Sequence, residues 1–416
     1  MNPLLDLLTS VVKSYPGIFS SPVVDVLYLV VLGLVAAQYG RVQSMEERMF
    51  EHPKNRALGH TLVSMGLGLL GGLAASVLLV MVGVTVSDSG LGYLLPIALF
   101  LFLWSPRFLC FSYSGGLLSL SYLLFGWPRV NVAAITALVA CLHAAESLLI
   151  RLSGHSCATP VYIQGKDERT IGGFSLQRFW PIPLIVLFLV RVPDVSALSG
   201  VISLPDWWPL IKAPEVAGVG TPVFTMMPII AALGYGDLAL SRTPKEKAKA
   251  TSRLLFLYSA ILLGFSIAAS RWSAFTWVAA LFAPLGHEVI IHLGNRDERE
   301  RDPRFVSTAS GVTLLDILGK GAAQKAGLEQ GYVLTEAQGI PLHSRHDLEE
   351  ILKEPGDIVF TVRPPRSTVA RQVTVHREVD EPLGAIISPG LGDQPFVSTH
   401  SEGPLLRLLK RLFTHS

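Results

Sequence analysis

The sequence predicts a two-part protein: an α-helical membrane body with about nine spans, followed by a small α+β domain. Of the 416 residues, 50% are hydrophobic and only 16% are charged, whereas a soluble globular chain carries about a quarter charged residues. Residues 22–294 are a series of apolar stretches separated by short polar loops, and residues 303–388 alternate apolar strands with turns. The chain therefore changes from a lipid-facing to a water-facing composition near residue 296.

Nine stretches suggest membrane-spanning helices, which need about 20 mostly apolar residues. They are residues 22–40, 60–86, 91–106, 108–127, 130–150, 181–203, 219–240, 254–270 and 272–294. Two are weak, because 91–106 is short and 181–203 contains Arg191 and Asp194. A charge within the bilayer is costly unless it faces protein or water. We interpret 181–203 as a short span whose arginine reaches the interface, and a functional polar site in the membrane is the alternative.

The charges of the loops predict the orientation of these spans. Loops on one side hold 14 Lys and Arg residues, and those on the other side hold five. The positive-inside rule places the richer side in the cytoplasm. With nine spans, the N-terminus is then outside and the C-terminal domain is cytoplasmic. Residues 1–21 carry one lysine and are interrupted by Pro16, which favours an amphipathic interfacial segment over a cleaved signal peptide.

Small residues recur in the second predicted span. Ser64, Gly68 and Gly72 are four residues apart, and small residues at this spacing allow close approach to a neighbouring helix. The pattern predicts packing within the chain, with a dimerisation face as the alternative.

The end of the last predicted span suggests an intramembrane zinc protease at first sight. In a zinc-binding His-Glu-x-x-His motif the two histidines lie one turn apart on one helix face. Here His287 and His292 are five residues apart, which separates them by about 140° around a helix of 3.6 residues per turn. The two histidines cannot both reach one ion from a regular helix. We therefore predict no catalytic residue and no metal site here, and we expect no catalytic residue, metal site or cofactor elsewhere in the chain.

The other residues of the membrane body that could carry chemistry are few. Cys110, Cys141 and Cys157 show no Cys-x-x-Cys or Cys/His metal spacing, so we interpret them as small buried apolar side chains. His143 and Glu146 are three residues apart and share a helix face. They predict a buried hydrogen-bonded pair between spans, with a proton-coupled site as the alternative.

The domain over residues 303–388 is predicted from alternating strands and helices. Ser344, followed three residues later by Asp347, is typical of a helix that begins with a capping box. The predicted strands are 311–318, two strands around a turn within 331–339, 358–363 and 369–377, and the predicted helices lie within 320–328 and at 345–353.

This order of elements resembles a bacterial PDZ domain. The most specific match is the helix Ala322-Ala-Gln-Lys-Ala-Gly-Leu328, followed by Gly-Tyr-Val-Leu and a turn that ends in glycine. The chain departs from the family pattern at Tyr332, where the family usually has Asp, and at Gln338, where it usually has Asn. These differences concern the turns more than the fold.

The resemblance implies a peptide-binding groove. PDZ domains hold a peptide C-terminus as an added strand, with its carboxylate on the N–H groups of a glycine-containing loop. A fitting loop, Glu381-Pro-Leu-Gly-Ala-Ile-Ile387, follows the last long strand instead of preceding the first, which implies a circularly permuted PDZ domain. The implied groove lies between 384–388 and the helix at 345–353, and an ordinary terminal hairpin without a ligand is the alternative. The expected peptide-binding residues are Leu383, Gly384, Ala385, Ile386, Ile387, His346, Glu349 and Glu350.

The tail, residues 389–416, contains a predicted basic amphipathic helix at 404–413. Leu405, Leu408 and Leu412 fall on one face, and Arg407 and Arg411 lie on the other. Such a helix suits an anionic membrane surface. Because ten residues do not hold a helix alone in water, it would fold on lipid or on a partner protein, and a disordered tail is the remaining alternative.

A multi-span body of residues 22–294 followed by a PDZ-like domain with a terminal Leu-Gly-x-Ile loop resembles the MinJ-type topology proteins of Gram-positive bacteria. The resemblance implies a non-enzymatic adaptor in the bacterial plasma membrane, which links a polar or septal DivIVA-like scaffold to the division-site inhibitor proteins MinC and MinD. The residues themselves indicate a membrane anchor with a peptide groove and no nucleic-acid partner. The rival functions are an intramembrane zinc metalloprotease with a regulatory PDZ domain and a transporter.

Overall fold

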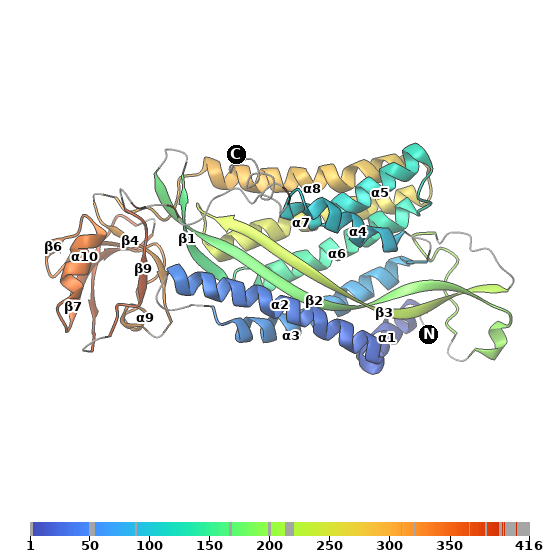
Figure 1. The fold of residues 1–416 in the computed structure, drawn as a ribbon, viewed down its shortest axis with the longest axis horizontal. Helices are drawn as coiled ribbons and strands as arrows, with labels where there is room; N and C mark the ends of the chain where they lie inside the picture. The colour runs from blue at the N-terminus through green and yellow to red at the C-terminus, as the bar shows by residue number, and fades with distance from the viewer. Residues whose placement is uncertain are drawn as a thin grey trace, which may run out of the picture.

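The computed structural model shows an elongated molecule in which helices lie along a long β-hairpin and a β-rich lobe closes one end (Figure 1). The described residues are 3–49, 55–87, 90–165, 169–198, 201–212, 220–308, 310–319, 321–365, 367–378, 381–390, 393, 395 and 405. The predicted tail helix at 404–413 lies outside them, apart from Leu405.

The helices of the body follow seven of the nine predicted apolar stretches. Five of them, α2, α3, α6, α7 and α8, are long and apolar enough to cross a membrane, and α4 and α5 are shorter apolar helices. The chain is thus a multi-pass membrane protein. The helices and 3-10 turns of this part are α1 (Pro3–Ser14), η1 (Tyr15–Ser20), α2 (Pro22–Met49), α3 (Ala57–Val82), α4 (Leu91–Phe102), η2 (Pro106–Leu109), α5 (Phe111–Phe125), α6 (Val132–Ser153), η3 (Val195–Ala197), α7 (Pro244–Ala269) and α8 (Ala274–Glu300).

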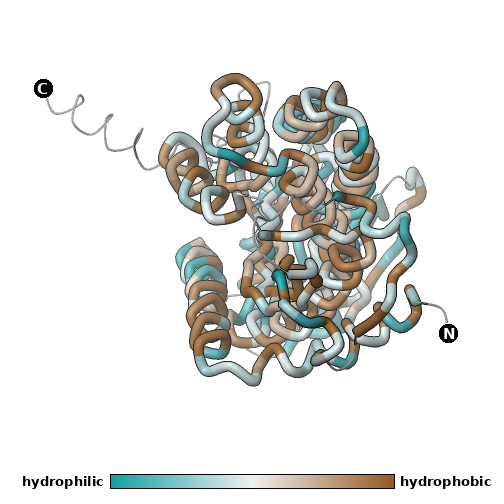
Figure 2. Tube along the Cα trace, turned by 90° about the vertical axis from the view of Figure 1, so that its right-hand side faces the viewer, coloured by the Kyte–Doolittle hydropathy of each residue, from teal (hydrophilic) through white to brown (hydrophobic). Residues whose placement is uncertain are grey.

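Large apolar side chains lie on the outside of the body as well as inside it. Leu29 on α2, Leu58 on α3 and Phe256 on α7 are 63%, 73% and 59% exposed. Figure 2 shows hydrophobic residues (brown) on the outer turns of several helices. Apolar surface this extensive is rare on a soluble monomer and fits helices whose outer faces contact lipid.

Two of the nine predicted spans are wrong as helices. Residues 181–203 and 219–240 belong mainly to two long strands that pair antiparallel. Proline explains part of the difference, since Pro181, Pro183 and Pro228 would each remove a hydrogen bond from a helix interior and clash with the preceding turn. Hydropathy alone did not separate an apolar strand from an apolar helix. The strands are β1 (Ala158–Gln164), β2 (Thr170–Val192) and β3 (Thr221–Ala239), in the sheet order β1-β2-β3.

The glycines of α3 pack against β2. A Cβ atom added at Gly68 would lie 2.1 Å from the carbonyl oxygen of Pro181, and one added at Gly72 would lie 2.2 Å from that of Pro183. The close approach predicted from the four-residue spacing is therefore present within the chain, but the partner is a strand and not another helix.

Hydroxyl groups satisfy backbone atoms on this edge of β2, where β1 has ended. The Ser76 hydroxyl accepts a hydrogen bond from the N–H of Ile185 (2.8 Å), and the Ser87 hydroxyl accepts one from the N–H of Leu189 (2.7 Å). The Tyr15 hydroxyl donates to the carbonyl of Pro183 in β2 (2.9 Å). An open sheet edge is not tolerated in hydrocarbon, and here protein groups take the place of the missing strand.

The C-terminal lobe is an antiparallel sheet with two short helices. Its strands are ordered β8-β7-β5-β4-β9, and β6 pairs with β5. The predicted capping box of Ser344 and Asp347 is present at the start of α10. Gln338 adopts a left-handed φ of 53°, and its side-chain amide donates to the Asp357 carbonyl (2.9 Å), which supports a conformation that is uncommon for a residue other than glycine or asparagine. The elements are β4 (Val312–Ile317), α9 (Ala322–Lys325), β5 (Val333–Ala337), β6 (Ile340–Pro341), α10 (Arg345–Leu352), β7 (Ile358–Arg363), β8 (Arg371–Val375) and β9 (Ala385–Ile387).

Candidate functional site

Strand β9 forms one edge of the lobe's sheet. Toward β4, the carbonyl of Gly384 accepts from the N–H of Leu318 (2.8 Å), and the N–H of Ser388 donates to the carbonyl of Thr313 (2.8 Å). Because backbone groups alternate along a strand, the N–H and C=O groups of residues 385 and 387 face the opposite edge. Such an edge is a template for an added strand.

The loop before β9 is anchored on α9. Gly384 has a φ of +69°, and an added Cβ would lie 2.7 Å from the Cα of Gly321, so this position requires glycine. The side chain of Leu383 is buried in the core of the lobe, and its carbonyl accepts from the N–H of Ala323 (2.9 Å). Substitutions at Leu383 or Gly384 would therefore disturb the fold of the lobe as well as any ligand contact.

An ion pair fixes the start of the same loop. Lys325 donates to Glu381 over 2.7 Å. The hydrogen bond from Lys325 is the main cause that lowers the pKa of the Glu381 carboxyl below its usual value. The loop therefore carries a negative charge close to the position where the resemblance expects a ligand carboxylate.

Helix α10 is the expected second wall of the groove. Arg345 forms an ion pair with Glu349 (2.6 Å), whereas His346 lies 3.9 Å from Glu350 on another, exposed face. Three residues of α10 were expected to bind peptide. Glu349 lies on the same face of the helix as Arg345, whereas His346 and Glu350 lie together on another face. Sequence reasoning missed Arg345, although its position four residues before Glu349 was a readable signal.

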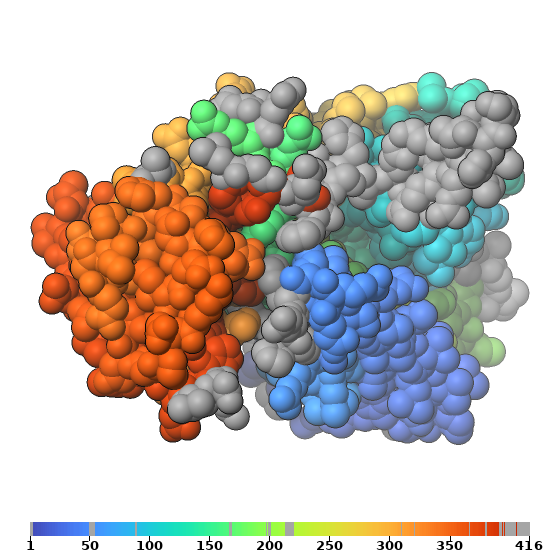
Figure 3. Space-filling model, turned by 60° about the vertical axis from the view of Figure 1, so that its left-hand side comes forward, coloured from blue at the N-terminus to red at the C-terminus, as the bar shows by residue number. Residues whose placement is uncertain are grey.

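Tyr162 of β1 contacts both β9 and α10. Its hydroxyl donates to the carbonyl of Ile387 (2.6 Å), on the edge of β9 that faces away from β4. The Arg345 guanidinium donates to the same tyrosine. Figure 3 shows the lobe (orange to red) beside the body, with red atoms next to the green atoms of the segment around β1. In this state a side chain of the body occupies part of the edge that an added strand would use.

The side chains of β9 pack against two different cores, one in the body and one in the lobe. Ile386 packs in the main apolar core together with Phe305 and Leu315, whereas Ala385 and Ile387 pack against the core of the lobe. The structure thus brings the five expected residues 383–387 together in one loop and strand, but much of their side-chain surface is covered.

Arg191 and Asp237, two charged residues of the hairpin that could line a transport path, lie far apart. Arg191 donates to a backbone carbonyl near the tip of the hairpin (2.7 Å). Asp237 lies opposite Leu176 in the strand register and pairs with Lys247 (3.3 Å). At ~3.3 Å per strand residue, Arg191 and Asp237 are about 50 Å apart, so the described structure does not gather them along one transport path.

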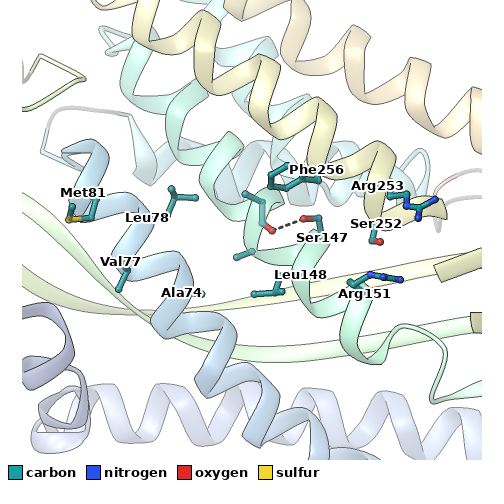
Figure 4. Close-up of a pocket in the computed structure, with 12 residues that line it drawn as sticks. Ala74, Val77, Leu78, Met81, Ser147, Leu148, Arg151, Ser252, Arg253 and Phe256 are labelled. Atoms are coloured by element: carbon teal, nitrogen blue, oxygen red, sulfur yellow. Dashed lines mark hydrogen bonds between the residues drawn. The ribbon is translucent and has the colours of Figure 1, made fainter. Parts of the chain in front are cut away.

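A cavity of about 760 Å³ opens between α3, α6 and α7. Figure 4 shows Leu78 and Met81 at one end of the lining and Arg151 and Arg253 at the other. An apolar groove between membrane helices with two guanidinium groups at one end suits the acyl chain and anionic head group of a lipid.

Comparison with known proteins gives one distant relation. No protein-family profile matches this chain. The chain is similar to the cell division topological determinant MinJ of Bacillus subtilis strain 168, with 23% identity over 228 residues. The similar region covers 55% of this chain and 52% of that protein, so the chain spans about half the length of its relative. The similarity is distant and applies at the level of a family.

Proposed function

We propose that this protein is a bacterial membrane adaptor that recruits protein partners through a cytoplasmic, circularly permuted PDZ-like domain in its C-terminal lobe. The observation that carries the proposal is the edge of β9 whose backbone groups are directed away from β4. Arg345 of α10 reaches the same edge through its contact with Tyr162. A partner peptide would add to this edge as a strand, so that main-chain hydrogen bonds supply affinity and side chains of α10 supply selectivity. The five long apolar helices anchor this module at a membrane.

A role in cell division is supported by the distant similarity to a cell division topological determinant. The partners that we propose are a DivIVA-like polar or septal scaffold and a MinD-like protein of the division-site inhibitor system. An adaptor of this kind works by bringing two proteins to one membrane location, which requires an anchor and a binding surface but no reaction.

The contact of Tyr162 with β9 would regulate partner binding. A partner strand needs the free backbone groups of β9, and the tyrosine hydroxyl already uses the carbonyl of Ile387. Partner binding and docking of the lobe on β1 therefore compete for the same edge. The affinity measured for a partner is reduced by the fraction of lobes that are docked.

The test is binding of the purified full chain, held in lipid nanodiscs, to purified DivIVA-like and MinD-like proteins of the same organism. Ala385→Pro removes one N–H from the unpaired edge of β9, where proline is tolerated, and does not touch the hydrogen bonds to β4. We expect this variant to lower partner affinity at least several-fold, since one main-chain hydrogen bond to the ligand contributes on the order of 1 kcal/mol.

Val369→Ser serves as the matched control, because Val369 is 72% exposed near the opposite edge of the same sheet. It should bind partners like the wild-type chain. Thermal unfolding of both variants establishes that the lobe remains folded. If neither protein binds the wild-type chain, or if folded Ala385→Pro binds as tightly as wild type, the groove is not the recruitment site.

A further inference from the structure

One thiol and two imidazoles converge inside the membrane body, far along the chain from the lobe. The Sγ atom of Cys110 lies 3.1 Å from Nε2 of His143 and 3.6 Å from Nε2 of His287. A ligand atom from each of the three residues lies within 4.8 Å of the other two. We propose that these residues form a binding site for one Zn²⁺ ion.

The spacing of the three atoms fits a tetrahedral zinc ion. With Zn–S of about 2.3 Å and Zn–N of about 2.05 Å, a tetrahedral site separates sulfur from nitrogen by about 3.5 Å. The two observed distances, 3.1 and 3.6 Å, lie on either side of this value. One thiolate with two imidazoles is also a donor set that suits zinc.

His143 is held in the tautomer that a metal ligand needs. Its Nδ1 atom lies 2.8 Å from the carbonyl oxygen of Val139. A carbonyl only accepts hydrogen bonds, so Nδ1 carries the proton and the lone pair is on Nε2, which faces Cys110. Ligating histidines commonly have their second nitrogen fixed by a carbonyl in this way.

His287 is oriented by a second chain of hydrogen bonds. The Tyr113 hydroxyl lies 2.7 Å from a carboxylate oxygen of Glu288 and donates to it. The tyrosine oxygen is then free to accept from Nδ1 of His287, 3.4 Å away, which leaves Nε2 of His287 unprotonated toward the sulfur. Arg107 binds the other oxygen of Glu288 (3.0 Å). Glu288 therefore positions a ligand through Tyr113 and is not the free general base of a zinc protease.

Zinc binds the thiolate form of cysteine, and the start of α5 positions the sulfur of Cys110. Cys110 is the N-cap of α5, and its sulfur accepts from the N–H of Ser112 (3.4 Å). Binding of Zn²⁺ releases the thiol proton to solvent, and both imidazoles bind as neutral groups.

Zinc at this position would join three parts of the body. Cys110 precedes α5, His143 lies on α6 and His287 lies on α8. The ring of Tyr258 from α7 contacts both imidazoles, with centroid distances of 5.6 and 5.5 Å. The fourth position of the tetrahedron is open to water or to Glu146, whose carboxylate oxygen lies 4.0 Å from Nε2 of His143. The site therefore ties the loop before α5 to the long helices.

The sequence predicted no metal site, because the spacing of neighbouring residues does not show ligands that lie far apart along the chain. His292, the partner suggested by the sequence, is exposed and is not part of the described cluster. The three ligands come from positions 110, 143 and 287, so only the packing of the helices brings them together. His287 and His292 still cannot reach one ion from one regular helix, whereas ligands on different helices are not limited in this way.

A metal-free arrangement of the same residues is the competing state. The Cys110 thiol can donate to His287. The Ser112 hydroxyl, 3.3 Å from Nε2 of His143, can donate to that imidazole. The two states differ in metal content, so a metal analysis separates them.

The test is the Zn²⁺ content of the full chain, purified in detergent and loaded with Zn²⁺ alone, measured by inductively coupled plasma mass spectrometry. We expect one ion per chain, lost in Cys110→Ser, His143→Gln and His287→Gln. Each loss of a ligand should weaken Zn²⁺ binding by more than the roughly 10- to 100-fold typical of an outer-shell partner. Co²⁺ in place of Zn²⁺ should give a thiolate charge-transfer absorption in the near ultraviolet that Cys110→Ser abolishes.

His292→Gln and Cys141→Ala are the matched controls, because they replace the same residue types on α8 and α6 outside the cluster. Both should keep the ion and the Co²⁺ absorption. Monodisperse elution on size exclusion identifies the folded preparations that are compared. The proposal fails if folded wild-type protein binds neither metal, which indicates the hydrogen-bonded cluster, or if His292→Gln loses as much metal as His287→Gln.

Discussion

At the scale of single residues, Tyr162 links the two parts of the molecule through one hydroxyl group. It donates to the carbonyl of Ile387 and accepts from Arg345, and its side chain is buried. Without the hydroxyl, the Ile387 carbonyl would lose this hydrogen bond, whereas Arg345 would keep its ion pair with Glu349. A buried polar group left unpaired costs about 1–3 kcal/mol, so this one oxygen makes a large contribution to docking.

We therefore predict that Tyr162→Phe loosens the lobe from the body without unfolding it. Hydrogen–deuterium exchange of the full chain should become faster in peptides that contain β1 and β9, by about 5- to 150-fold if the docked state loses ~1–3 kcal/mol. The same variant should bind a partner peptide more tightly, because fewer lobes are docked.

Tyr332→Phe is the control for this prediction. Its hydroxyl accepts from Arg371 (2.8 Å), which lies within the lobe and does not bridge to the body. This variant should leave exchange in β1 unchanged. Equal exchange rates in β1 for Tyr162→Phe and wild type would show that the hydroxyl does not hold the two parts together.

At the scale of elements, the packing of α3 on β2 depends on backbone contact that only glycine permits. Two of the α3 glycines face carbonyl oxygens of β2 at distances that leave no room for a Cβ atom. The helix can then approach the strand closely enough for serine and tyrosine hydroxyls to reach its backbone. This contact covers the edge of β2 that would otherwise face lipid.

Gly72→Val is predicted to destabilise this packing strongly. Its Cβ would lie 2.2 Å from the carbonyl oxygen of Pro183, which is backbone and cannot move aside alone. We expect a loss on the order of 1–3 kcal/mol from overpacking, seen as a lower midpoint of thermal unfolding in detergent. Gly66→Val is the matched control, because nothing lies within 4 Å of its added Cβ. Equal midpoints for the two variants would contradict the packing described for α3 and β2.

The elements differ in how far the sequence predicted them. Seven of the nine apolar stretches were predicted correctly as helices from their length and hydropathy. The strands β2 and β3 were missed because a long apolar strand has the same hydropathy as a span. The prolines at 181, 183 and 228 were the signal that could have distinguished them. In the lobe, turn and capping residues such as Ser344 act locally, and this helix start was predicted correctly.

The sites were less predictable than the elements. The loop and strand at 383–387 could be found from sequence because their residues are contiguous. Arg345 and Tyr162 could not be assigned to the groove in the same way, since Tyr162 reaches it only through packing of the body on the lobe. The cluster of Cys110, His143 and His287 is likewise assembled by three separate helices.

At the scale of the whole molecule, the β-hairpin changes the path of the chain but not the side on which the other loops lie. Strand β2 leads away from the end of the body that carries the lobe, and β3 returns to it, as two helices would have done (Figure 1). The return is fixed by the ion pair of Asp237 at the end of β3 with Lys247 at the start of α7 (3.3 Å). The orientation predicted from loop charges therefore does not depend on whether these segments are helices or strands.

We predict that the lobe is cytoplasmic and that the tip of the hairpin is external. A reporter fused after Lys249 or Arg304 should give a cytoplasmic signal, because the loops that share their side hold 14 Lys and Arg residues against five on the other side. One inserted near Asp206, between β2 and β3, should be external. At ~3.3 Å per residue β2 extends about 75 Å, which exceeds the ~30 Å hydrocarbon core of a bilayer and carries the tip beyond the membrane.

Paired fusions to alkaline phosphatase, active outside, and to a fluorescent protein that folds only in the cytoplasm check each position. An external signal after Lys249 would reverse the orientation, and a cytoplasmic signal near Asp206 would mean that the hairpin does not cross the bilayer.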